Sequence, residues 1–175
     1  MTRDPSWLAD HLRDVPDFPE PGIVFKDLTP LLADVDAFRF AVDAMADHAA
    51  GLTVDKVVGV EARGFIFAAA VAYRLGSGFV PVRKPGKLPW KTVTESYALE
   101  YGSDSLDIHD DALGAGDEIY VVDDVLATGG TAAATCRLVE RLGGRVAGLS
   151  FVVELGFLDG RAKLADHDIL SLITV

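Results

Sequence analysis

Cysteine is almost absent from the sequence, and basic residues are scarce. Cys136 is the one cysteine in 175 residues, so no internal disulfide can form, and four scattered histidines give no zinc-ligand spacing. The 16 Lys and Arg are outnumbered by 27 Asp and Glu, which gives a formal charge of -11. Such a charge repels nucleic acid and anionic membrane, so a bound polyphosphate would need a local source of positive potential.

Long apolar runs are also missing. The longest apolar stretch, around Phe65 to Tyr73, is too short to span a membrane, and residues 1–15 carry several charges and no signal-peptide core. We therefore expect a cytoplasmic protein. The composition, 50% hydrophobic and 25% charged, is typical of a globular protein, and the length suits one domain.

Strands and helices are predicted to alternate from residue 56 onward. A β-branched run predicts a strand at Lys56 to Glu61, and a helix-forming segment follows it and ends at Gly76. A second helix is predicted from Gly129 to Leu142, and further strands at Phe79 to Val82, Glu118 to Asp123, Arg145 to Glu154 and Ile169 to Val175. This alternation predicts a mostly parallel sheet with helices on both faces, and ligands of such sheets bind beyond the C-terminal ends of the strands.

The remaining segments are less regular. Helical spacing predicts a helix from Ala37 to Ala49. A short N-terminal helix is predicted by Leu8, Leu12 and Val15. Pro16 to Pro30 carries four prolines, so we expect an irregular surface arm there. Lys84 to His109 is expected to be a long, partly extended excursion, and long loops inside compact domains are usually functional.

The most informative segment is Tyr120 to Thr131, YVVDDVLATGGT. Apolar residues end a strand, two carboxylates follow, and small residues lead into a helix. Small residues let the backbone approach an anion, the helix N-terminus points free N–H groups at it, and the hydroxyls of Thr128 and Thr131 add donors. The segment lacks the lysine and spacing of a P-loop and is not the G-x-G-x-x-G turn. It predicts a cradle for one phosphate group.

Asp123 and Asp124 stand directly before this cradle. Their carboxylates can accept hydrogen bonds from vicinal hydroxyls, so a ribose 5-phosphate would satisfy both features. An acidic pair followed by a glycine turn is common at strand ends and needs no function. The combination of two carboxylates, an apolar strand and a T-G-G-T loop is much rarer, which favours the functional interpretation.

The same segment resembles the signature of phosphoribosyltransferases that use phosphoribosyl pyrophosphate (PRPP). Four further segments, FPEPGIVFKDLTPLL, EARGF, VRKPGKLPW and SYALEYGSDSLDIH, resemble the adenine phosphoribosyltransferase family in the same order, and the likeness spans Phe18 to Leu155. The resemblance implies an α/β type I phosphoribosyltransferase fold with a mostly parallel central sheet. It also implies a flexible catalytic loop, an N-terminal hood at about residues 1–34 and a PRPP-binding core at 35–175, all in one domain.

The resemblance assigns the sugar and its 5-phosphate. In the family, the residues that match Asp123 and Asp124 hold the ribose hydroxyls. The 5-phosphate is bound by the residues that match Ala127, Thr128, Gly129, Gly130 and Thr131. Both assignments agree with the interpretation reached from the residues themselves.

The resemblance also assigns the pyrophosphate. The pyrophosphate loop of the family, with its unusual peptide geometry, is matched by Glu61, Ala62, Arg63 and Gly64. Arg63 suits this role physically, because a guanidinium binds phosphate oxygens bidentately and a cation with no partner at a helix N-terminus opposes the dipole. The basic group Arg83, Lys84 and Lys87 completes this site, although such a run alone is usually a solvated face. Lys87 is expected to reach across a subunit boundary.

The acceptor base is assigned in the same way. Phe25 matches the aromatic residue that stacks on adenine, the backbones of Val24 and Lys26 read the base edge, and Leu155 covers the other face. Without the flanking match, Phe25 would count as a core residue. Glu100 and Tyr101 match the catalytic loop, where Glu100 would act as general acid/base near N7 of adenine, and Arg63 would stabilise the departing anion.

The expected reaction is therefore adenine plus PRPP giving AMP and pyrophosphate. Mg²⁺ is expected to be carried mainly by PRPP, so no metal site made of protein ligands alone is assigned. The expected assembly is a homodimer, with no nucleic acid or membrane partner. Two alternatives stay open: a xanthine- or guanine-type transferase, and a regulator that binds PRPP on the same fold without catalysis.

Overall fold

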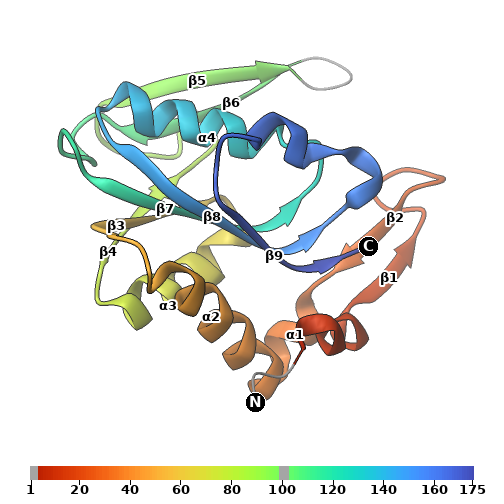
Figure 1. Cartoon of the computed structure of the whole chain (residues 1–175). Coiled ribbons are helices and arrows are strands. Elements are labelled where there is room, and N and C mark those ends of the chain that lie inside the picture. Colours follow the sequence, from red (N-terminus) through yellow and green to blue (C-terminus); the bar gives the residue numbers. More distant parts are fainter. Residues whose placement is uncertain (1–3, 99–102) are drawn as a thin grey trace.

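A five-stranded parallel sheet forms the centre of the computed structural model, which describes residues 4–98 and 103–175 (Figure 1). The strand order is β4-β3-β7-β8-β9, and all four pairings are parallel. The strands are β3 (Lys56–Val60), β4 (Gly78–Val82), β7 (Glu118–Leu126), β8 (Arg145–Glu154) and β9 (Ile169–Thr174). All five predicted strands are confirmed, and β7 runs on through both aspartates.

Helices cover both faces of this sheet, as the alternating pattern predicts. On one face, α2 (Val35–Ala49) and α3 (Gly64–Leu75) enclose a core that includes Phe67 and Tyr120. On the other face, α4 (Gly130–Arg141) packs beneath a two-stranded ribbon, and Figure 1 shows both above the sheet. Their core includes Leu138 and Phe151. α3 ends at Gly76, whose φ of 70° is one that glycine adopts readily.

The N-terminal region differs from the expectation. A 3-10 helix, η1 (Pro5–His11), ends before Val15, which lies in strand β1 (Arg13–Pro16), so the helix predicted through Val15 is wrong there. Residues 16–30 were expected to be irregular, yet they contain strand β2 (Val24–Asp27), which pairs antiparallel with β1, and the start of the short helix α1 (Thr29–Ala33). The prolines at 16, 19 and 21 lie in β1 and the turn after it, which leaves the β2 backbone free to pair.

The excursion from Lys84 to His109 is mostly an antiparallel ribbon of β5 (Thr92–Ala98) and β6 (Ser103–His109), which confirms the partly extended expectation. The ribbon is fastened to α4 by Glu95, whose carboxylate accepts hydrogen bonds from Arg137 Nε at 2.6 Å and Arg141 Nη1 at 3.0 Å. The ribbon is therefore fixed to the C-terminal half of α4.

The strand order reverses its direction between β3 and β7. The chain leaves β3 through α3 to reach β4 on one side, and leaves β7 through α4 to reach β8 on the other. Open sheets bind ligands beyond the C-terminal ends of the strands at such a point. No helix within residues 4–98 and 103–175 is long and apolar enough to cross a membrane.

Candidate active site

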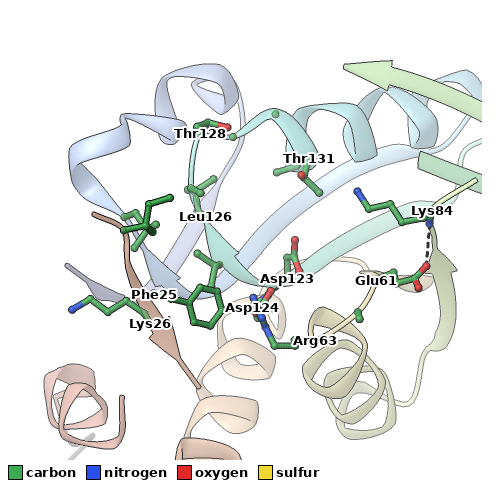
Figure 2. Close-up of a pocket in the computed structure, with 18 of the residues that line it drawn as sticks. Phe25, Lys26, Glu61, Arg63, Lys84, Asp123, Asp124, Leu126, Thr128 and Thr131 are labelled. Carbon is green, nitrogen blue, oxygen red and sulfur yellow. Dashed lines mark hydrogen bonds and ion pairs between the residues drawn. The ribbon is translucent and has the colours of Figure 1, made fainter. Parts of the chain in front are cut away.

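A pocket of about 480 Å³ opens at this reversal point (Figure 2). Its walls come from four parts of the chain: the β1–β2 hairpin, the loops that follow β3 and β4, the end of β7 with the start of α4, and the residue that follows β8. The lining residues are Ile23, Val24, Phe25, Lys26, Glu61, Ala62, Arg63, Lys84, Asp123, Asp124, Val125, Leu126, Ala127, Thr128, Gly129, Gly130, Thr131, Ala132 and Leu155.

The loop from Ala127 to Thr131, which leads into α4, forms one wall of the pocket. Gly129 caps the helix in the left-handed region, at φ 76°, and a Cβ there would lie 2.3 Å from the carbonyl oxygen of Gly160. A Cβ on Gly160 would lie 2.0 Å from the carbonyl oxygen of Ala127. The two glycines therefore let the loop pack against the segment at 160. The first N–H groups of α4 have no acceptor within the helix and are available to an anion.

The two aspartates near the end of β7 are buried, and each residue is 7% exposed. Arg63 Nε donates to Asp124 Oδ2 at 2.5 Å, and the same guanidinium lies over the ring of Phe25, with Cζ 5.0 Å from the ring centroid. Arg63 thus joins the loop after β3, the end of β7 and the hairpin. Figure 2 shows its side chain between Phe25 and the aspartates.

No cation among the described residues forms an ion pair with Asp123. Burial, and then the neighbouring charge of Asp124, raise the pKa of Asp123 well above its usual range. Its Oδ1 accepts a hydrogen bond from the Asp124 backbone N–H at 2.9 Å. Gly64 lies directly below, because a Cβ on Gly64 would come 2.4 Å from Asp123 Oδ1. A desolvated carboxyl group therefore lies at the floor of the pocket, and any side chain at position 64 would clash with it.

The loop after β3 is built around Glu61, whose peptide bond to Ala62 is cis. The Glu61 carboxylate accepts hydrogen bonds from Arg83 Nε and Nη2, both at 3.1 Å, and from the backbone N–H of Lys84 at 3.0 Å. The bonds from Arg83 hold the pKa of Glu61 below its usual range. Arg83 Nη1 also donates to the carbonyl oxygen of Lys87 at 3.0 Å. Arg83 therefore fixes the loop backbone, and each of its three guanidinium nitrogens donates one hydrogen bond there.

The hairpin supplies the aromatic wall. Phe25 pairs with Val15 across β1 and β2, and Phe18 packs edge-on against its ring with the centroids 5.2 Å apart. Lys26 Nζ donates to Asp14 Oδ1 at 2.6 Å, so its ammonium binds within the hairpin. Leu155, directly after β8, also lines the pocket.

Comparisons with known proteins agree with this geometry. The model of the phosphoribosyl transferase domain matches residues 31–171. An adenine phosphoribosyltransferase of Thermobifida fusca (strain YX) is 56% identical, with 100% of each chain covered. The chain belongs to the adenine phosphoribosyltransferase family.

Solved structures of family members share the fold. The adenine phosphoribosyltransferase of Thermoanaerobacter pseudethanolicus superposes with a TM-score of 0.94 at 53% identity, and the match covers 97% of this chain and 98% of the other. The enzyme from Saccharomyces cerevisiae, complexed with an imino-altritol bisphosphate and adenine, gives 0.89 at 42% identity, covering 95% and 96%. The type I phosphoribosyltransferase fold expected from the sequence is confirmed.

Most of the residues to which the sequence analysis assigned a role in binding line this pocket. Gly64, Arg83 and Lys87 are not among the lining residues in the described part of the chain, and the first two act from behind it. Glu100 and Tyr101 lie outside the described residues.

The sequence analysis missed three residues that support the pocket. Gly160 packs against the loop from Ala127 to Thr131, Tyr97 lies against Gly130, and Asp104 binds Lys84 Nζ. No spacing in the sequence relates Gly160 to residues 127–129. Tyr97 and Asp104 belong to the segment SYALEYGSDSLDIH, whose likeness to the family was the one available signal.

The raised pKa of Asp123 predicts a trade-off between stability and function. An unfolded aspartate ionises near pH 3.9, so Asp123 costs stability as the pH rises above that value and until it passes the folded-state pKa. We expect Asp123→Asn, which keeps the Oδ1 acceptor, to raise Tm at pH 7, with about 2–4 °C for each 1 kcal/mol in a domain of this size. The gain should vanish as the pH falls to about 4.

Melting curves from pH 4 to 8 measure this effect. The exposed Asp111, changed to Asn, is the matched control and should show no such pH-dependent gain. A Tm for Asp123→Asn that is unchanged or lower at pH 7 would contradict the assignment of a desolvated carboxyl group.

Proposed function

We propose that this chain transfers the phosphoribosyl group of PRPP to adenine, giving AMP and pyrophosphate. The observation that carries the proposal is one pocket that combines a backbone anion cradle, a buried aspartate pair next to it and an aromatic arm. A ribose 5-phosphate and a purine base fit these three features in that order. The curated relatives named adenine phosphoribosyltransferase cover the whole chain, which favours adenine as the acceptor.

The two anionic ends of PRPP, the 5-phosphate and the pyrophosphate, are assigned to two walls of the pocket. The 5-phosphate binds the N–H groups and hydroxyls of Ala127 to Thr131, and Asp123 and Asp124 accept hydrogen bonds from the ribose hydroxyls. The pyrophosphate binds the backbone of Glu61 to Gly64 with Arg63 and Lys84. Arg83 contributes by fixing that backbone through its bonds to Glu61 and Lys87.

The base is assigned to the hairpin. Phe25 stacks on adenine, Leu155 covers the other face, and the backbones of Val24 and Lys26 bind its edge. The binding of Lys26 Nζ to Asp14 is consistent with a role through the backbone. Arg63 covers Phe25 in the structure, so adenine stacking on that face requires the guanidinium to move towards the pyrophosphate.

Catalysis in this proposal is mainly electrostatic. Cleavage at C1′ leaves an oxocarbenium-like ribose while negative charge grows on pyrophosphate, which Arg63 and Lys84 stabilise. Glu100 relays the imidazole proton as N9 of adenine attacks C1′. The described residues hold no cluster of three or more His, Cys, Asp or Glu suited to a metal ion. We assign Mg²⁺ mainly to oxygens of PRPP, where it would neutralise charge on the leaving group.

The reaction is tested by supplying each purine base with PRPP and Mg²⁺ and measuring pyrophosphate release. We expect release with adenine and much less with guanine, xanthine or hypoxanthine. A preference for guanine or xanthine would replace adenine with the rival acceptor. PRPP binding without release with any base would favour a regulator.

We also infer a homodimer formed through α3 and the edge strand β4. Ile66 and Tyr73 lie on one side of α3 at seven-residue spacing, 43% and 91% exposed, and Phe79 on β4 is 37% exposed. An apolar face beside an unpaired strand edge suits a second copy of the chain. Lys87 follows β4, which is consistent with a role at such a boundary.

Light scattering at tens of micromolar protein tests the assembly. The mass should be twice 18.6 kDa, and Tyr73→Asp should shift it towards the monomer. Phe157, which is also exposed but lies beyond β8, provides the control, and Phe157→Asp should leave the mass unchanged. A monomeric wild-type chain would rule out the dimer.

A further inference from the structure

Asp104 binds the one lysine in the pocket lining that faces the phosphate cradle. The Lys84 ammonium pairs with Asp104 Oδ2, and Figure 2 shows the lysine side chain extending from the β4 end towards Thr131. Lys84 belongs to the loop after β4, whereas Asp104 belongs to β6 of the ribbon. The pair therefore joins one wall of the pocket to the ribbon behind it.

The Asp104 carboxylate is held in place by the ribbon itself. Its Oδ1 accepts the backbone N–H of Ser105 at 2.8 Å, and its Oδ2 accepts the hydroxyl of Tyr97 at 3.1 Å. Tyr97 is 7% exposed and its ring lies against Gly130, so it fixes the ribbon on α4. The carboxylate is thus anchored by two donors besides Lys84, and the lysine is the partner that can move.

Hydrogen bonds connect this pair to the phosphate loop. Thr131 Oγ1 donates to the hydroxyl of Tyr97 at 3.1 Å, which in turn donates to Asp104. A threonine hydroxyl has one proton, so a phosphate on the loop competes with Tyr97 for it. This series of contacts runs from Thr131 through Tyr97 and Asp104 to Lys84. Thr131 and Lys84, at its two ends, are assigned by the proposed function to opposite ends of PRPP.

We propose that Asp104 is a competing counterion that holds Lys84 and weakens the grip of the site on pyrophosphate. The inference rests on the proposed function, since it takes Lys84 as a pyrophosphate ligand. A fixed carboxylate repels a bound polyanion and attracts the ammonium that this polyanion needs. Lys84 and Asp104 side chains are 41% and 31% exposed, so solvent screens their attraction and the exchange is readily reversible. Asp104 acts through Lys84 and is a positioning residue.

The direction of the expected effect is unusual, because removal of a charged residue near the site should tighten binding. Asp104→Asn removes the charge and keeps the Oδ1 acceptor for the backbone N–H of Ser105, and its amide NH2 can donate to the hydroxyl oxygen of Tyr97. We expect the Kd for Mg²⁺-PRPP, measured by calorimetry, to fall roughly 1.5- to 5-fold, the range for partly exposed ion pairs. The KM for PRPP should fall with it, while the KM for adenine stays unchanged.

Three further variants make the test specific. Asp117→Asn removes the partner of Lys56, a pair of similar exposure at the start of β7, and should leave PRPP binding unchanged. Asp104→Glu keeps the charge and should bind PRPP as the wild type does. In a Lys84→Met background, addition of Asp104→Asn should give less than half the effect it has alone, since the counterion then has no partner.

The outcomes separate this inference from the proposed function. Wild-type binding of PRPP with equal or weaker binding by Asp104→Asn overturns the counterion role alone. An undiminished effect in the Lys84→Met background also overturns it, because the cause would then be the overall charge. If the wild type does not bind PRPP, both the proposed function and this inference fall.

Discussion

The ion pair between Arg63 and Asp124 is the contact on which the rest of the site depends. The chain places two adjacent carboxylates at the buried end of β7, where desolvation opposes their charge. Arg63 compensates one of them and at the same time lies over Phe25, so it ties the loop after β3 and the hairpin to β7. Asp123 has no such ion pair among the described residues, so the desolvation of its carboxyl group destabilises the fold. Folds tolerate such a loss of stability at functional sites.

In the proposed function an acidic chain binds a polyanion, and cations held by local ion pairs supply the positive charge. Its formal charge is -11, yet three cations gather at one side of the pocket, each held by a carboxylate: Arg63 by Asp124, Arg83 by Glu61 and Lys84 by Asp104. The bidentate Arg83 pair stabilises the loop backbone. The pairs of Arg63 and Lys84 involve cations in the pocket lining, so these two can exchange a carboxylate for a phosphate oxygen. Helix α4 adds N–H groups without adding any charge.

Sequence reasoning recovered what depends on local order along the chain. The apolar runs gave every strand of the main sheet, and the order of strand, carboxylates and small residues located the loop at Tyr120 to Thr131. Contacts between segments that lie far apart in the sequence could not be predicted in this way. The pairing of β1 with β2 overrode a helical spacing at Val15, and Gly160 supports a loop some thirty residues earlier. The ion pair of Arg83 with Glu61 was also beyond sequence reasoning, because a sequence shows a charge but not its partner.

The placement of the substrate is tested most directly by a crystal structure of the chain with AMP bound. The account predicts the 5-phosphate on the N–H groups of residues 127–131, the ribose hydroxyls on Asp123 and Asp124, and the adenine ring against Phe25, with Arg63 displaced from that ring. A phosphate bound at Lys84 and Arg63 instead of the α4 loop, or a base that lies away from Phe25, would contradict it.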